Sequence, residues 1–175
     1  MSIITASITN KNYYKNPYFD LLVDSNRRST RIAANFFSDE LTTKNLLYTL
    51  SILKAKLPST LRSKCFNKDN LPFEKEVINT ELGHLFEHIL LEYIGEIKRS
   101  LGMKNPIHNG ITKWNWNKDK RGVFHITIDL GTKDEDILQV SLSKTMLLVE
   151  EIMISEQNIH INPAPSPVPL PLHLK

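Results

Sequence analysis

The segment that most constrains this chain is residues 80–101, TELGHLFEHILLEYIGEIKRSL, the longest stretch with the apolar spacing of an α-helix. Its large apolar residues recur every three or four positions, which predicts a helix with one continuous buried stripe. They are Leu82, Leu85, Phe86, Ile89, Leu90, Ile94 and Ile97. The same stretch carries His84, Glu87 and His88 in the order His-x-x-Glu-His. A fold of this chain must therefore bury the stripe and place both histidines beside it.

The spacing of the two histidines is that of a metal site. Residues four apart on a helix share a face, with Cβ atoms about 5–6 Å apart, so His84 and His88 can bind one ion. In the inverted zincin motif the two imidazoles hold Zn²⁺, and a glutamate placed as Glu87 is the general base. The alternative is a polar helix face that holds two histidines without a metal. Burying two unpartnered imidazoles costs free energy, which favours the metal.

Composition narrows the class of protein. A length of 175 residues with 41% hydrophobic and 23% charged residues is typical of one globular domain. The net charge of +3 comes from scattered lysines and arginines, so no basic stripe indicates nucleic acid. There is no signal-peptide pattern and no apolar run of membrane-spanning length, so the cytoplasm is expected. A single cysteine, Cys65, excludes a disulfide framework and is interpreted as structural.

The patterns along the chain predict an α+β fold. Strands are expected at 2–10, 18–24, 111–117 and 122–130, and helices at 42–57, 80–101 and 134–154. This gives one domain over residues 1–157, of order β-β-α-α-β-β-α, with an antiparallel sheet packed against helices. Alternating prolines in residues 158–175 predict a disordered tail.

Several short motifs extend the picture. Gly83-His84, Glu87-His88 and Glu92 lie on the central helix, and Gly102-Met103 follow it. Further along come Gly110-Ile111-Thr112-Lys113 and Gly122-Val123-Phe124, and Asn12-Tyr13-Tyr14 lies near the start. In this order the motifs resemble the N-terminal domain of cyanophycin synthetase, over roughly residues 9–153. The family's ATP-grasp and ligase domains do not fit in the chain, so the resemblance implies that module alone.

The resemblance implies a pitrilysin-like zinc site and cleavage of an Asp/Arg polymer. The third zinc ligand stays open between Asp129, ranked first from an acidic position on the family's last strand, Glu92 and Glu150. Glu92 could instead accept a hydrogen bond from the histidine ring nitrogen that does not bind the metal, which would fix the tautomer of that histidine. Lys113, His125 and Arg121 are candidates for holding a substrate carboxylate or the oxyanion. Ile111 stands where the family pattern has an arginine, so the chain departs from the pattern at a position expected to recognise the polymer's side chains.

Three functions remain after this reading. The first is a zinc-dependent hydrolase of a peptide or isopeptide, with Glu87 as general base. The second is a non-catalytic binding or assembly module that keeps the helix for structure. The third is a zinc lyase of the S-ribosylhomocysteine type, whose cysteine ligand follows the motif, whereas Cys65 precedes it. By analogy with pitrilysin enzymes, which build their cleft from several units, a homodimer is also expected.

Overall fold

The computed structural model describes residues 10–65, 71–104, 106 and 108–161. Five strands form one antiparallel sheet in the order β1-β2-β3-β5-β4. Their bounds are Asn10–Lys15 for β1, Phe19–Ser25 for β2, Thr30–Phe36 for β3, Gly110–Lys113 for β4 and Val123–Ile128 for β5. The predicted α+β fold with an antiparallel sheet is confirmed.

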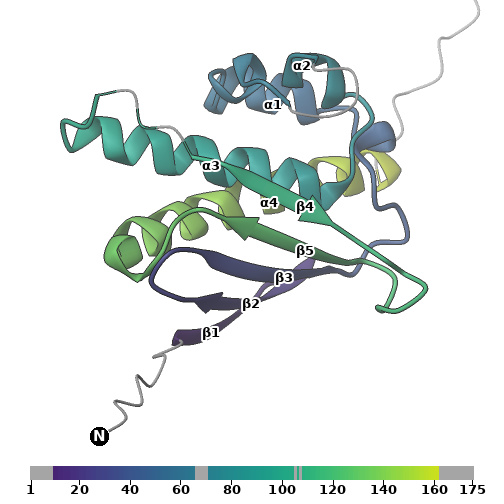
Figure 1. Ribbon diagram of the computed structural model, residues 1–175. Helices are drawn as coiled ribbons and strands as arrows, with labels where there is room; N and C mark the ends of the chain where they lie inside the picture. The colour runs from purple at the N-terminus through teal and green to yellow at the C-terminus, as the bar shows by residue number, and fades with distance from the viewer. Residues whose placement is uncertain (1–9, 66–70, 105, 107, 162–175) are drawn as a thin grey trace, which may run out of the picture.

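Helices lie on one side of this sheet. Two long helices, α3 (Leu82–Ser100) and α4 (Glu135–Ile161), pack side by side over its inner face (Figure 1). Two short helices, α1 (Thr49–Lys56) and α2 (Phe73–Glu76), lie on the side of α3 that faces away from the sheet (Figure 1). The 3₁₀ turns are η1 (Thr43–Asn45), η2 (Thr60–Arg62) and η3 (Thr132–Asp134). Helix α3 is therefore covered on two sides.

The alternation of the strands decides which side chains enter the core. In β2, β3 and β5 every second residue is fully buried beneath the helices, as expected for a sheet with one covered face. The apolar residues among them are Phe19, Leu21, Val23, Ile32, Ala34, Phe36, Phe124, Ile126 and Ile128. The apolar stripe of α3 packs on them, and Phe86 meets Phe19 edge-on at 5.9 Å. The prediction that Phe124 and its same-face neighbours form core is confirmed.

The structure differs from the sequence prediction in several elements. Strand β3 was not predicted, because its run TRIAANF follows an arginine-rich turn and contains two alanines, which are weak strand formers. Strand β4 ends at Lys113, earlier than predicted, and Trp114 and Trp116 instead pack on Phe124. The first helix is shorter than predicted, since η1 precedes it. Helix α4 runs to Ile161, past the start of the predicted tail at residue 158.

Two predictions fall largely on residues outside the described ones. The predicted strand 2–10 has only residue 10 within the described part of the chain, where it begins β1. The predicted tail has only residues 158–161 within it, and these belong to α4.

A glycine allows α3 to approach the sheet closely. A Cβ atom at Gly83 would lie 2.4 Å from Cγ of Phe124 on β5, and both residues are buried. The next residue in the helix is His84, so this contact fixes the depth at which the histidines sit. The first turn of α3 is also tied to the preceding chain, because Leu82 N donates to Leu41 O at 2.9 Å.

We predict that Gly83→Ala lowers the free energy of unfolding by about 1–3 kcal/mol, because the added methyl group overpacks against Phe124. Urea denaturation of the metal-free protein measures this. Gly95→Ala in the same helix is the matched control. The atoms nearest to its added Cβ would be those of the flexible guanidinium of Arg99, the first at 3.3 Å. The control should raise stability by about 0.5–1 kcal/mol through helix propensity. Equal effects of the two substitutions would contradict this account of the helix–sheet contact.

Candidate metal centre

The two histidines of α3 turn their Nε2 atoms toward each other, 3.1 Å apart. Their rings lie beneath η2 and α2, where the buried Phe73 stacks on His88 with ring centres 3.8 Å apart and 11° between the planes. The same phenyl ring meets His84 edge-on at 5.8 Å. The helix spacing and the aromatic contact together hold both imidazoles in fixed orientations.

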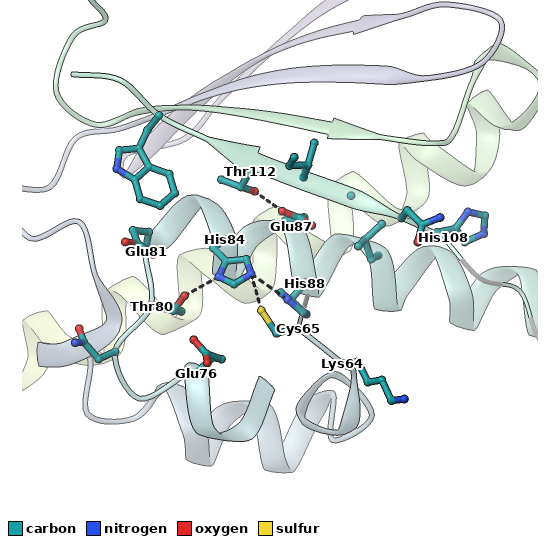
Figure 2. A pocket seen from close by; sticks show the side chains of 16 residues that line it. Lys64, Cys65, Glu76, Thr80, Glu81, His84, Glu87, His88, His108 and Thr112 are labelled. Atoms are coloured by element: carbon teal, nitrogen blue, oxygen red, sulfur yellow. Dashed lines mark hydrogen bonds between the residues drawn. The ribbon is translucent and has the colours of Figure 1, made fainter. Parts of the chain in front are cut away.

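Cys65, just beyond η2, approaches the two imidazoles from the side opposite Glu87 and Thr112 (Figure 2). Its Sγ lies 3.3 Å from His84 Nε2. The ligand atoms of Cys65, His84 and His88 all lie within 4.8 Å of one another, so this group could hold a metal ion. A tetrahedral zinc site with ordinary bond lengths has N···N and N···S edges of about 3.3 and 3.6 Å. The Nε2···Nε2 separation of 3.1 Å and the 3.3 Å from Cys65 Sγ to His84 Nε2 are close to these edges, and the third pair of ligand atoms lies within 4.8 Å.

Hydroxyl groups hold the outer nitrogen of each imidazole. Ser63 Oγ lies 3.0 Å from His88 Nδ1 and donates its own proton to Thr60 O at 2.6 Å, so it accepts from Nδ1–H. That tautomer leaves the Nε2 lone pair of His88 directed at the cluster. Thr80 Oγ1 lies 2.8 Å from His84 Nδ1, where it can accept a hydrogen bond when Nε2 of His84 binds a metal.

Burial keeps both imidazoles neutral. Desolvation, together with the neighbouring His84, lowers the pKa of His88 to about 3. Desolvation also lowers the pKa of His84, against the opposing effect of Glu81 and Glu76. Neutral imidazoles are the form that binds metals. The site is therefore ready for a metal at neutral pH without displacing protons from the histidines.

Glu87 is buried on the strand side of the imidazoles (Figure 2). Its Oε2 accepts a short hydrogen bond from Thr112 Oγ1 on β4. A Cβ atom at Gly110 would lie 2.6 Å from its Oε1, so glycine at that position makes room for the carboxylate. Desolvation raises the pKa of Glu87, and the Thr112 hydrogen bond partly opposes it. A raised carboxyl pKa suits a group that accepts and returns a proton near neutral pH.

The histidines and Glu87 open into a cleft of about 370 Å³. One wall is α3, the second is β4 with the residues before it, and the third is the chain around α2 (Figure 2). It is lined by Lys64, Cys65, Glu76, Asn79, Thr80, Glu81, His84, Glu87, His88, Leu91, His108, Asn109, Gly110, Ile111, Thr112 and Trp114. A substrate in this cleft would meet Glu87 and the metal ligands together.

The three acidic candidates for the third ligand are held elsewhere. Asp129 accepts from the backbone N and Nδ2 of Asn109, at 2.9 and 3.2 Å. Glu92 binds Arg99 at 2.7 Å, and Glu150 accepts from Asn16 at 3.5 Å. Within the described part of the chain, the histidines are joined in a metal-competent group by Cys65 and by none of these carboxylates. Cys65, interpreted from the sequence as structural, thus lies in a group that could also hold a metal ion.

The candidate substrate-binding residues lie outside the cleft. Lys113 and His125 face each other across β4 and β5 on the exposed face of the sheet, away from α3, and His125 contacts Asp119 at 3.1 Å. Arg121 donates to Asp39 O at 3.1 Å and lies over the Trp116 ring. Sequence reasoning did not find Ser63, Thr80 and Thr112 as partners of the site. For Thr112, the alternation of side chains along β4 could have indicated that this residue faces the central helix.

Comparison with models of known protein families gives no match, and comparison with curated protein sequences gives none. The resemblance to the cyanophycin synthetase module therefore stays a prediction. No helix in the described part of the chain combines the length and the apolar character needed to cross a membrane.

We predict that Cys65→Ser weakens Zn²⁺ binding by about 100-fold or more, because a soft thiolate donor is replaced by a poor hydroxyl donor. Asp129→Asn should leave the affinity unchanged. Titration of the chelator-treated protein with Co²⁺ reports the same site, since a thiolate–cobalt charge-transfer band should appear in wild type and in Asp129→Asn but not in Cys65→Ser. Binding of Co²⁺ to wild type without this band, together with a loss of affinity in Asp129→Asn, would show that Asp129 and not Cys65 is the third ligand.

The metal-free protein should lose stability as the pH falls from 6.5 toward 3. The pKa of His88 falls from 6.5 in the unfolded chain to about 3 in the folded one, so only the unfolded chain gains a proton in this range. The loss is up to about 1.4 kcal/mol for each pH unit. Above pH 6.5 both states are neutral at His88, so it has no effect there. Urea denaturation in chelator at several pH values measures this, and His88→Gln should flatten the profile. An unchanged slope in that variant would refute the assignment.

Proposed function

We propose that this protein is a metal-dependent hydrolase that cleaves a peptide or isopeptide bond. One observation carries the proposal: Cys65, His84 and His88 converge as a metal-competent group in a cleft that the buried Glu87 also lines. A metal with three protein ligands keeps a position open for water or substrate, as catalytic zinc sites do. The order His-x-x-Glu-His on a helix supplies the same chemistry from the sequence.

Zinc is the metal we propose, because two neutral imidazoles and one thiolate match its preference for nitrogen and sulfur donors. When bound, such an ion lowers the pKa of water and polarises a carbonyl group. A reducing compartment such as the cytoplasm would keep the Cys65 thiol available for the metal.

The chain's own residues would move the proton. Glu87 takes a proton from the attacking water and delivers it to the leaving amine, which its raised pKa favours. Thr112 holds one carboxylate oxygen and leaves the other to face the cleft beside Gly110. Ser63 and Thr80 fix the orientation of the imidazoles, so the ligand set needs little rearrangement.

The charges around the cleft support a substrate with a cationic side chain. Glu76 and Glu81 line it beside His84, and both exert a Coulombic pull on that imidazole. Trp114, the residue that follows β4, adds an aromatic surface to the cleft that suits a guanidinium. An Asp/Arg polymer of the cyanophycin type has such side chains, on isopeptide bonds. It is the substrate that we propose to test first, beside ordinary arginine-containing peptides.

We predict that Glu87→Gln lowers the cleavage rate by about 10²–10⁴-fold, because the amide cannot accept the proton. The variant should still bind metal with unchanged stoichiometry, since Glu87 is not one of the three ligands. Cleavage of arginine-containing peptides and of the Asp/Arg polymer, followed by mass spectrometry beside elemental analysis, measures both. Full activity in Glu87→Gln would rule out its role as general base. Loss of the metal in the same variant would show that Glu87 is a ligand.

A non-catalytic binding or assembly module is the second candidate. The observation that favours it is that the cluster can satisfy itself without a metal, since the two Nε2 atoms lie at hydrogen-bonding distance. In that case His84 would donate to the His88 lone pair and accept from Thr80 at Nδ1. This function requires no stoichiometric metal, even after zinc is added, and partner binding that survives His84→Ala.

The zinc-lyase alternative also gains an observation. Such a lyase has a Cys-His-His ligand set in which the cysteine follows the motif, whereas Cys65 precedes it. The fold nevertheless brings Cys65 close to both histidines. Cleavage of a sugar thioether, tested beside the peptides, separates the lyase from the hydrolase.

A further inference from the structure

Helix α4 exposes a line of three large apolar side chains. Val140, Leu147 and Ile154 are 51%, 68% and 40% exposed, and each is seven residues from the next. Seven residues are close to two helical turns, so the three side chains follow one another along the helix. The opposite face of α4 is buried in the core through Leu138, Leu142, Val149 and Ile152. This line, here called the α4 stripe, therefore points away from the domain.

Single exposed apolar residues are common on protein surfaces, but the α4 stripe also has charged residues on one flank. Lys144 lies three residues before Leu147, and Glu151 lies four residues after it. Lys144 lies over the Tyr93 ring at 5.0 Å, and Glu151 receives the Lys56 ammonium at 2.5 Å. These contacts already restrict the rotamers of Lys144 and Glu151. A contact with a binding partner would therefore cost these two side chains less conformational entropy.

The stripe is complementary to itself when two copies of α4 run antiparallel. Val140 and Ile154 are each seven residues from Leu147. A two-fold axis at Leu147 therefore places Val140 of one copy opposite Ile154 of the second copy, and Ile154 opposite Val140. Such an axis brings the same flank of both helices together. In this register Lys144 of each copy lies within one residue of the position opposite Glu151 of the other copy. The dimer therefore has two such Lys144–Glu151 pairs. In a parallel pair the opposite flanks of the two helices would meet instead, so Lys144 and Glu151 would not pair with each other.

We propose that α4 is a self-association surface through which two copies of this chain form an antiparallel, two-fold symmetric dimer. Leu147 lies on the axis, with Val140 and Ile154 on either side and Lys144–Glu151 pairs along one edge. None of the stripe residues lines the cleft, so both clefts stay open in the dimer. The proposal does not depend on the metal or on hydrolysis.

The mass of the full chain in solution tests it, by sedimentation velocity and light scattering over a range of concentrations. Wild type should approach twice the chain mass of 20.1 kDa. Leu147→Glu should raise the dissociation constant by about 100-fold or more, because two carboxylates would face each other on the axis. Leu101→Glu is the matched control. That leucine is 71% exposed at the end of α3 and should leave the mass unchanged.

A charge exchange tests the antiparallel register. Lys144→Glu and Glu151→Lys should each weaken the dimer, and the double variant should recover most of the wild-type affinity. Both positions are on the surface, so the test holds even if Leu147→Glu fails to fold, which circular dichroism would reveal. A monomeric wild type at every concentration, a dimer unaffected by Leu147→Glu, or no recovery in the double variant would overturn the proposal.

Discussion

The double burial of α3 is the constraint on which the rest of this structure depends. One side of the helix packs on the sheet so closely that only glycine fits at position 83, against Phe124. The other side lies beneath η2 and α2, where Phe73 stacks on His88. A helix covered on one side would leave its polar face in water. Here the same face is desolvated, which lowers the pKa of both imidazoles and raises that of Glu87.

This desolvation gives the cluster its chemistry. Buried neutral imidazoles need partners, and the structure supplies one for each nitrogen: a hydroxyl at Nδ1 and the shared cluster at Nε2. The Glu87 carboxylate is also accommodated by its neighbours, since Thr112 donates a hydrogen bond to one oxygen and Gly110 leaves space for the other. The partners come from β4, from the chain just after η2 and from the residue before the N-cap of α3, all of which lie against this helix. The site is thus a product of the same contacts that stabilise the helix.

The two long helices have different roles. Helix α3 is buried on two sides and carries the candidate centre, whereas α4 covers the sheet with one face and leaves the α4 stripe exposed. The cleft and the stripe share no residue, so association and hydrolysis can be tested separately. The exposed outer face of the sheet carries Lys113 and His125, which the sequence had placed near the substrate.

The sequence by itself determined the features that rest on local periodicity. The apolar stripe and the His-x-x-Glu-His spacing predict the position of α3 and the side-by-side imidazoles, because one helix contains all these residues. Alternation in β5 likewise identifies Phe124 and Ile126 as core. Only the tertiary structure decided the third member of the cluster. Cys65 reaches His84 across a chain reversal of nineteen residues, and its position depends on how η2 and α2 pack over α3. The spacing of residues along the chain does not predict how these segments pack together. Asp129, in contrast, follows β5 but is turned to Asn109, a contact that no strand pattern specifies.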